Sequence, residues 1–245
     1  MLIIADMDGT LTESRQEAGQ DMVNIMCKIL QEHLFCIISG ASYERIKKQV
    51  LTKMPPIPEI KDMYIVAQSG AEIYDCSKMI YKRAMSPPDK MLVKMLLNNI
   101  AMINGEILER HGIKIDLLNP LIVDKGSQIT FSIAGVNTDI SIKKIIDSDA
   151  SIRKSIVAIL KPFLPPNINM AIGGTTSIDF TPKGINKRFG VQYLQRHLGV
   201  GIEDIVYIGD KCFIGGNDWI GSEYNYHNVT SPNETLNILK NICSS

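Results

Sequence analysis

A short apolar run, Leu2 to Ala5, stops abruptly at the acidic sequence Asp6-Met7-Asp8-Gly9. A run of this length that is closed by a turn is typical of a strand buried on both faces, as in a parallel sheet. Leu34 to Ile38 and Met63 to Ala67 are apolar runs of the same kind. Residues 17–33, between the first two runs, have the apolar spacing of a helix. This alternation predicts an α/β fold with a doubly wound, Rossmann-like parallel sheet.

The middle of the chain has a different organisation, in which helices and several strands follow one another without regular alternation. Helical patterns lie near residues 88–103 and 151–162, and strand-like patterns lie near 110–116, 121–124, 128–134, 168–172 and 176–181. Polar and apolar side chains alternate from Gln128 to Ile133, which is typical of an antiparallel strand. After Lys187 the alternation returns, with a helix to about His197 and then an apolar strand from Ile205 to Ile208. We therefore expect a core of residues 1–83 and 185–245, interrupted by an inserted α+β cap domain of residues 84–184.

The charge and the cysteine content argue against several classes of protein. Lys plus Arg and Asp plus Glu each number 26, so the formal net charge is zero, and no basic run marks a nucleic-acid-binding surface. The five cysteines form no CxxC pair, which argues against a disulfide framework and a thiolate zinc site. No apolar run approaches the roughly 20 residues that cross a bilayer, and Asp6 comes too early for a signal peptide. We expect a cytoplasmic protein with no nucleic-acid or membrane partner.

Acidic and hydroxyl side chains follow three of the predicted strands. They are Asp6 and Asp8, Ser39 with Gly40, and Asp210 with Asp218 further along the same loop. Each group alone also fits a turn or a helix cap. In open α/β sheets, however, ligands bind outside the carboxyl ends of the strands. Carboxylates gathered there are costly unless a cation compensates them, and Mg²⁺ prefers oxygen ligands that it often shares with substrate phosphates. The sequence therefore predicts a Mg²⁺ site at the carboxyl edge of the sheet.

Four segments in a fixed order make this prediction specific. They are Asp6-Met7-Asp8-Gly9-Thr10-Leu11-Thr12, then Ile37-Ile38-Ser39-Gly40, then Lys187, and finally Gly209-Asp210-Lys211 with Gly215-Gly216-Asn217-Asp218. This series resembles the four motifs of the haloacid dehalogenase superfamily, and the resemblance covers the whole chain. The insertion between the second and third motifs resembles the class II (type IIB) cap of that family, which sets substrate specificity.

The resemblance implies a mechanism and a set of metal ligands. Asp6 would attack phosphorus and become an aspartyl-phosphate, which splits one difficult displacement into two easier ones. Asp8 would protonate the leaving oxygen and later take a proton from the incoming water. Mg²⁺ would be held by Asp6, by the backbone carbonyl of Asp8 and by Asp210, with Asp218 reaching the metal through water.

The same resemblance implies a phosphate-binding set. Ser39 and Lys187 would hold the oxygens of the transferring phosphoryl group, together with the backbone amides of Met7, Asp8 and Gly40. Stabilisation of the charge on these oxygens is the main contribution that a protein makes to phosphoryl transfer. Ser39 and Lys187 are therefore counted, with Asp6 and Asp8, among the predicted catalytic residues.

Within the superfamily, the segment from Gly173 to Phe180 is similar to a cap strand of the eukaryotic-type phosphomannomutases and their bacterial relatives. That strand presents a serine and an aspartate to the sugar, which implies substrate contacts for Ser177 and Asp179. The two residues alternate with apolar neighbours, so their side chains point to one face of the strand. An ordinary half-exposed strand would show the same alternation. Lys125 stands where a phosphate-binding arginine of the cap is expected and is a further candidate.

The cap departs from the mutases in its arginines. Val136 stands at a second arginine position, and residues 137–143 contain no arginine at all. A mutase must hold a phosphate at each end of the sugar, and the bidentate fork of arginine suits this task. Four cap cations, Arg153, Lys143, Lys144 and Lys154, could supply charge, but we expect all four on a solvated face.

We therefore favour a phosphatase that transfers the phosphoryl group of a small phosphomonoester, in particular a sugar phosphate, to water. A phosphomannomutase that interconverts hexose 1- and 6-phosphates is the alternative, and a non-catalytic binding protein is a remote one. The resemblance also allows a homodimer formed through the cap.

Overall fold

The computed structural model describes residues 1–110 and 112–244. It divides into two compact units, of which the first comprises Met1–Lys82 and Ile185–Ser245, and the second comprises Arg83–Gly184. We call the first unit the core and the second the cap. Each unit has its own sheet and its own hydrophobic interior.

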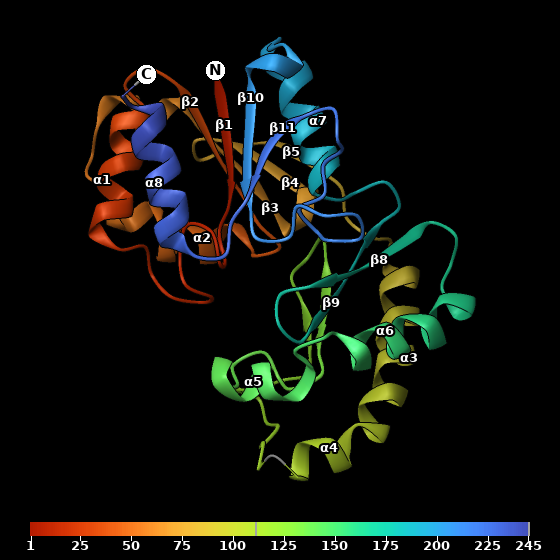
Figure 1. The fold of residues 1–245 in the computed structure, drawn as a ribbon. Coiled ribbons are helices and arrows are strands. Elements are labelled where there is room, and N and C mark those ends of the chain that lie inside the picture. The colour runs from red at the N-terminus through yellow and green to blue at the C-terminus, as the bar shows by residue number, and fades with distance from the viewer. Residues whose placement is uncertain (111, 245) are drawn as a thin grey trace. The chain divides into compact units, whose positions relative to one another are not determined.

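The described part of the core contains one seven-stranded sheet in the order β11-β10-β1-β2-β3-β4-β5 (Figure 1). The first five strands in this order are parallel, and β4 and β5 form an antiparallel hairpin at the edge. The strands are β1 (Leu2–Asp6), β2 (Leu34–Ile38), β3 (Met63–Ala67), β4 (Glu72–Asp75), β5 (Lys78–Lys82), β10 (Ile205–Gly209) and β11 (Asn225–Asn228).

Helices cover both faces of this sheet, as a doubly wound fold requires. Alternate side chains of β1 show why, because Ile3 enters one apolar cluster and Ile4 enters another, and both are fully buried. One face is covered by α1 (Gln20–Ile29), α2 (Tyr43–Gln49) and α8 (Pro232–Ile242), and the other by α7 (Lys187–Leu198) (Figure 1). Short 3₁₀ turns connect the elements at Leu51–Lys53, Pro58–Asp62, Gln68–Gly70 and Ile202–Asp204.

The cap contains an antiparallel sheet in the order β6-β7-β9-β8. Its strands are β6 (Ile122–Asp124), β7 (Ile129–Ser132), β8 (Ile168–Gly173) and β9 (Ser177–Pro182). Its helices are α3 (Pro87–Ile103), α4 (Gly105–Arg110), α5 (Ile140–Asp147) and α6 (Ser151–Leu160), followed by a 3₁₀ turn at Lys161–Phe163. Phe131 and Phe180 stand on one face of the sheet and enter the apolar cluster with residues of α3 and α6. Thr130 and Asp179 are paired on the opposite, polar face.

The structure corrects the sequence prediction in the middle of the chain. The predicted strand near 110–116 is wrong, because α4 ends at Arg110 and residues 112–116 are irregular, whereas residue 111 lies outside the described residues. Ile113 and Ile115 alternate with polar residues as in a strand, but Ile113 packs on the cap interior and Ile115 is exposed. The hairpin of β4 and β5 and the helix α5 were not predicted.

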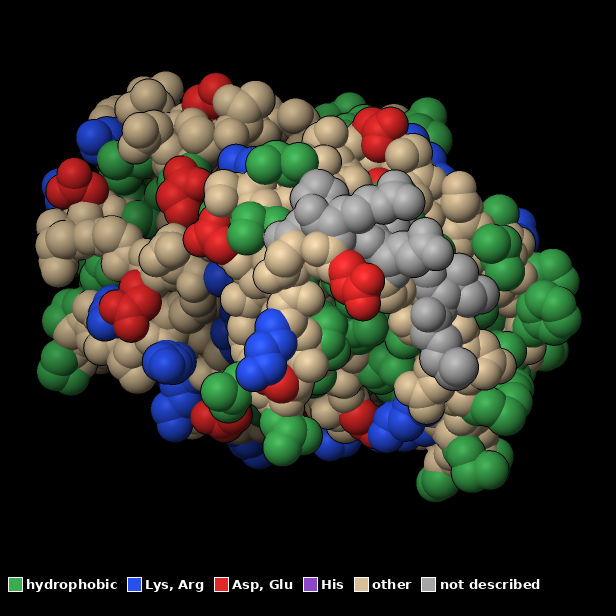
Figure 2. Space-filling model, turned by 90° about the horizontal axis from the view of Figure 1, so that it is seen from below, with side chains coloured by type: hydrophobic (Ala, Val, Ile, Leu, Met, Phe, Trp, Pro, Cys, Tyr) green, Lys and Arg blue, Asp and Glu red, His purple; other side chains and the backbone are tan. Residues whose placement is uncertain are grey.

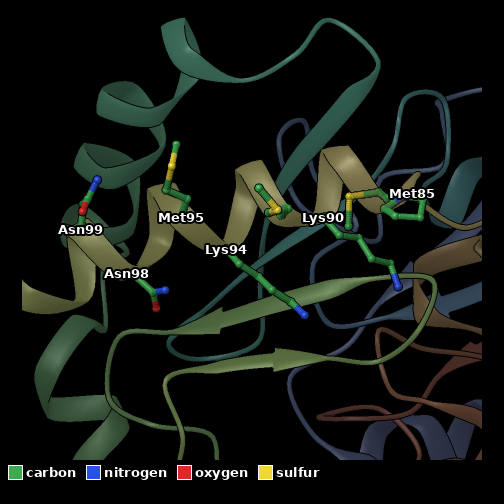
Figure 3. A pocket seen from close by; sticks show the side chains of 8 residues that line it. Met85, Lys90, Lys94, Met95, Asn98 and Asn99 are labelled. Carbon is green, nitrogen blue, oxygen red and sulfur yellow. The ribbon is translucent and has the colours of Figure 1, made fainter.

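A pocket of about 800 Å³ lies along α3 on the surface of the cap (Figure 3). Lys90 and Lys94 line it, and both ammonium groups pair with Asp124 at the end of β6, at 3.2 and 2.8 Å. Two exposed methionines, Met91 and Met95, line it as well. The pocket lining contains no carboxylate, hydroxyl or thiol group that could carry chemistry.

Acidic and basic side chains are interspersed on the face shown in Figure 2. Among the residues that the structure describes, no helix combines the length and the apolar character that a membrane crossing needs.

Candidate active site

Three loops meet at the carboxyl edge of the core sheet, because β10, β1 and β2 are parallel neighbours. Asp6 ends β1, Ser39 directly follows β2, and Asp210 directly follows β10. The loop after β10 then brings Asp218 back to the same place, where its carboxylate is fully buried. Residues that lie more than 200 positions apart in the sequence are thus gathered by strand order alone.

Lys187 joins two of these carboxylates. Its Nζ lies 2.6 Å from Asp6 Oδ1 and 2.6 Å from Asp218 Oδ1, and its side chain is 2% exposed. Lys187 is the first residue of α7, whose start is fixed by the side chain of Asn186, which accepts a hydrogen bond from the amide of Phe189 at 2.8 Å. The helix cap therefore determines where the ammonium group enters the site.

Asp218 is held on both of its oxygens. Besides the ammonium group, the hydroxyl of Tyr207 donates to Oδ1 at 2.6 Å, and the amide of Lys211 donates to Oδ2 at 3.2 Å. Burial alone would raise the pKa of Asp218, but the charge of Lys187 and the hydrogen bonds from Lys187 and Tyr207 outweigh burial and lower it. Asp218 is therefore ionised and acts as a fixed negative charge under the site.

Asp6 has the opposite balance. Burial is the largest cause, and the negative charge of Asp218 is the next, so together they raise the pKa of Asp6 although Lys187 opposes them. The pKa of Asp210 is also raised, first by burial, with the charge of Lys211 opposing it at 3.0 Å and that of Asp218 adding to it. Two ammonium groups thus face three buried or half-buried carboxylates.

These three carboxylates fit a divalent cation. One oxygen from each of Asp6, Asp210 and Asp218 can be chosen so that all lie within 4.8 Å of one another. Asp210 Oδ1 and Asn217 Oδ1 are buried and have no hydrogen-bond partner. A cation would satisfy such oxygens and supply the missing positive charge, and an all-oxygen set is what Mg²⁺ prefers.

The turn after β1 brings its backbone close to the side chain of Asp210. Gly9 has φ +86°, and a Cβ atom there would lie 3.0 Å from Asp210 Oδ2. The carbonyl of Met7 accepts hydrogen bonds from the amides of Leu11 and Thr12 at 3.0 and 2.9 Å, which closes the turn. Only glycine gives both this left-handed conformation and room for the aspartate.

Ser39 belongs to a second rigid turn. It is 2% exposed, and its Oγ accepts a hydrogen bond from the amide of Ala41 at 3.0 Å. Its backbone is anchored to the end of β3, because its amide donates to the carbonyl of Val66 and its carbonyl accepts from the amide of Ser69, both at 2.9 Å. The hydroxyl is therefore fixed in place and keeps its own proton for donation.

Asp8 has partners that the sequence did not indicate. Its Oδ1 accepts hydrogen bonds from the amide of Arg15 at 2.7 Å and from Nη2 of Arg45 at 2.5 Å. Arg45 comes from α2, six residues beyond Ser39. No pattern in the sequence marks this arginine, because on a short helix it reads like the solvated Lys47 and Lys48 beside it.

In the cap, Ser177 and Asp179 lie on the polar face of β9. Asp179 Oδ1 accepts a hydrogen bond from the hydroxyl of Thr130 at 2.6 Å, and that hydroxyl accepts one from the side-chain amide of Gln128 at 3.1 Å. Thr130 and Gln128 are therefore polar neighbours of the predicted pair, and the alternation along β7 was the signal for them. Lys125 lies in the turn between β6 and β7, beyond the strand pairing that carries Asp179.

Arg153 and Lys143 are not on a solvated face, so that prediction is wrong. Arg153 is 4% exposed and Lys143 is 5% exposed. Arg153 Nε pairs with Asp147 at 2.6 Å, and its Nη1 donates to the carbonyls of Gly173 and Gly174 at 3.1 and 3.0 Å. Lys143 Nζ donates to the carbonyl of Val136 at 2.8 Å. Both cations stabilise turns of the cap. Their aliphatic stems are buried on the helix faces, where apolar side chains would otherwise lie.

The sequence matches the family model of haloacid dehalogenase-like hydrolases over residues 3–218. A phosphomannomutase of Triticum aestivum is 26% identical over 99% of this chain and 95% of that protein. A phosphomannomutase of Galdieria sulphuraria is 28% identical over 96% of this chain and 91% of that protein.

Two solved structures share the fold at low sequence identity. The IMP-bound, N-terminally truncated IMP-nucleotidase of Plasmodium falciparum has a TM-score of 0.65 at 18% identity, and the match covers 100% of this chain and 68% of that chain. A trehalose-6-phosphate phosphatase related protein has a TM-score of 0.55 at 16% identity, and the match covers 100% of this chain and 97% of that chain.

Proposed function

The chain belongs to the haloacid dehalogenase-like hydrolases and is an enzyme, and from this premise we propose that it is a Mg²⁺-dependent phosphatase. Its substrate is a small phosphomonoester, and its phosphoryl acceptor is water. The observation that carries the proposal is the buried set at the carboxyl edge of the core sheet, where Lys187 lies between Asp6 and Asp218 with Asp210 beside them.

Asp6 is the proposed nucleophile. In the first step a carboxylate oxygen of Asp6 bonds to phosphorus while the bond to the leaving oxygen breaks, and Asp8 donates a proton to that oxygen. In the second step water bonds to phosphorus, its proton passes to Asp8, and the bond between Asp6 and phosphorus breaks. The short contact with Lys187 supports this role, because a cation at Asp6 favours the ionised, nucleophilic form.

Five groups are proposed to hold the phosphoryl oxygens, namely the side chains of Ser39 and Lys187 and the backbone amides of Met7, Asp8 and Gly40. The fixed hydroxyl of Ser39 and the buried ammonium group support this assignment. Donors that are already oriented cost no reorganisation when charge moves onto the transferring group.

Asp6, Asp210 and the backbone carbonyl of Asp8 are proposed to hold Mg²⁺, with Asp218 contacting it through water. When bound, the ion neutralises charge on the phosphoryl oxygens and on the carboxylates around it. The unsatisfied oxygen of Asp210 supports its place among the ligands. The three hydrogen bonds that Asp218 already accepts support an outer position for that residue.

A sugar phosphate is the substrate class that we propose. The polar face of the cap sheet supports it, because the partly exposed Ser177 and Asp179 present groups that can exchange hydrogen bonds with sugar hydroxyls, while the buried hydroxyl of Thr130 holds Asp179. The similarity to the phosphomannomutases of Triticum aestivum and Galdieria sulphuraria supports the same class. Lys125 stays a proposed substrate contact, and a homodimer through the cap stays a prediction.

A phosphomannomutase activity is the second candidate, and the same relatives favour it. A mutase must grip a second phosphate with cap cations. Arg153 is committed to Asp147 and two backbone carbonyls, and Lys143 is committed to a carbonyl, so neither is available for that task. This arrangement supports the phosphatase.

A phosphate-release screen tests the proposal. Purified protein with Mg²⁺ is incubated with sugar phosphates and other small phosphomonoesters, and Asp6→Asn serves as the control. Release by the wild type and none by Asp6→Asn is the expected result. Conversion of mannose 1-phosphate to mannose 6-phosphate that depends on a hexose bisphosphate, without net phosphate release, would replace the phosphatase by the mutase.

A further inference from the structure

Asp8 is held by a residue to which neither the motifs nor the proposed mechanism gives a role. Nη2 of Arg45 lies 2.5 Å from Asp8 Oδ1, and both side chains are 26% exposed. The pair therefore lies at the rim of the site, where the carboxylate can reach a substrate. Arg45 is well placed to fix the orientation of this carboxylate.

Arg45 is itself held in place by its own helix. Its Nε donates to Oε1 of Gln49 at 2.8 Å, one turn further along α2. The side-chain amide of Gln49 donates to the carbonyl of Arg15 at 2.6 Å, and the amide of Arg15 donates to Asp8 Oδ1 at 2.7 Å. These hydrogen bonds form a closed ring in which every member is fixed by two others.

A purely structural role would make Arg45 a tether for the loop between β1 and α1. That tether already exists without it, because Gln49 holds the loop through the carbonyl of Arg15 and also through the amide of Ala18, which donates to the carbonyl of Gln49 at 2.8 Å. The Nη2 contact of Arg45 goes to Asp8. The guanidinium therefore adds a contact to the side chain of Asp8, in a loop whose backbone Gln49 already holds.

We propose that Arg45 is a positioning residue for proton transfer by Asp8. This inference rests on the proposed function. The guanidinium and the Arg15 amide occupy Oδ1, so Oδ2 is the oxygen that exchanges the proton. In the first step Oδ2–H gives its proton to the leaving oxygen as the phosphorus–oxygen bond breaks and the bond from Asp6 to phosphorus forms. In the second step Oδ2 takes a proton from water as the oxygen of water bonds to phosphorus and Asp6 is released.

Two classes of substrate separate positioning from phosphate binding. A 4-nitrophenyl phosphate has a leaving group that departs without a proton, whereas an alkyl or sugar phosphate needs one. The measured quantity is kcat/KM, because it reports the steps up to formation of the phosphorylated enzyme. Arg45→Met is expected to lower kcat/KM for the alkyl phosphate by about 10²-fold, the usual contribution of a well-placed general acid. For 4-nitrophenyl phosphate the value should stay close to that of the wild type.

Three further variants make the test specific. Arg45→Lys keeps a cation on α2 and should restore part of the loss on the alkyl phosphate. Asp8→Asn should abolish the effect of Arg45→Met when the two are combined. Arg188→Met removes an arginine that pairs with Glu223 on the surface of the core, and it should leave both substrates unchanged. Thermal unfolding of each variant identifies any that fails to fold.

The outcomes are distinct. If the wild type releases phosphate from both substrates and Arg45→Met loses kcat/KM equally on both, Arg45 binds the phosphate and the positioning role is wrong. An unchanged alkyl phosphate activity in Arg45→Met overturns the role as well. A wild type that is inactive on both substrates overturns the proposed function, and this inference with it.

Discussion

At the scale of single residues, the site is organised by one lysine shared between two carboxylates. Burial would lower the pKa of Lys187, but the charges of Asp218 and Asp6 outweigh burial and raise it, so the ammonium group stays protonated. Between the two carboxylates, Asp218 is the one whose pKa is lowered, and Asp6 is the one whose pKa is raised. A phosphoryl group or a metal ion entering the site meets a charge arrangement that is already fixed.

The raised pKa of Asp6 predicts how the metal-free protein responds to pH. Burial and the charge of Asp218 raise it to about 8, so the folded state binds a proton that the unfolded state has released above about pH 4. The contribution of Asp6 to the free energy of unfolding is therefore present at about pH 4 and is lost as the pH rises to about 8. Thermal unfolding in the presence of a chelator should therefore show a falling midpoint over this range. Asp6→Asn should remove most of the fall, and parallel curves for the two proteins would contradict the assignment.

Tyr207→Phe tests the support under Asp218. Removal of the hydroxyl takes one donor from a buried, ionised carboxylate and should lower the free energy of unfolding by about 1.5–3 kcal/mol, as for other hydrogen bonds to charged groups. Urea denaturation measures the loss. Tyr226→Phe, at a half-exposed position, is the control and should stay within about 0.5 kcal/mol of the wild type. Equal effects of the two substitutions would show that the hydroxyl of Tyr207 does not support Asp218.

At the scale of elements, the cap depends on a buried cation that links three segments. Arg153 on α6 pairs with Asp147 at the end of α5, and it donates to the carbonyls of Gly173, at the end of β8, and Gly174, in the turn that leads into β9. That turn directly precedes Ser177 and Asp179. The position of the proposed sugar-binding face therefore depends on an arginine that lies outside it.

Arg153→Met should destabilise the cap by about 3–5 kcal/mol, because it leaves the Asp147 carboxylate buried without its partner. Urea unfolding followed by circular dichroism measures this loss. Arg188→Met breaks a pair whose side chains are 41% and 42% exposed and should cost at most about 1 kcal/mol. A loss for Arg153→Met no larger than for this control would mean that the buried pair is not important for stability.

The elements also mark the limit of prediction from sequence. The strands β1, β2, β3 and β10 could be read directly, because burial on both faces leaves an unbroken apolar run that ends at a turn. The edge hairpin of β4 and β5 could not, since β5 is only partly buried and carries lysine at both ends. The helix α5 was missed because it is short and because a lysine, Lys143, occupies one position of its buried face, where an apolar residue is expected.

In the candidate site, too, some residues could be predicted from the sequence and others could not. Asp6, Ser39, Lys187 and the aspartates of the last loop could be found because they stand in motifs at strand ends. Arg45 and Tyr207 could not, since their importance comes from tertiary contacts with Asp8 and Asp218 that no local pattern encodes.

At the scale of the whole molecule, the chain forms two units with separate apolar interiors, and each unit carries different polar groups. The described titratable groups gathered at the carboxyl edge of the sheet belong to the core, and the polar sheet face belongs to the cap. The proposed metal and phosphoryl chemistry and the proposed choice of substrate are therefore assigned to separate units.

This division predicts that damage to the cap spares the metal site. Isothermal titration calorimetry with Mg²⁺ should give the same affinity for Arg153→Met as for the wild type, provided that the variant is folded at the temperature used. Asp210→Asn removes a proposed ligand and should weaken Mg²⁺ binding by at least about tenfold. If Arg153→Met weakens binding as much as Asp210→Asn does, the two units are not independent in this respect.

The claim at the centre of this account is that Asp6 carries the phosphoryl group. The most direct test is to quench a reacting mixture of enzyme, Mg²⁺ and substrate in acid, reduce it with borohydride, and sequence the peptide of residues 1–15 by mass spectrometry. Reduction converts an aspartyl-phosphate to homoserine, so homoserine at position 6, absent without substrate, is the predicted result. Turnover without modification at position 6, or with modification at another residue, would contradict the account.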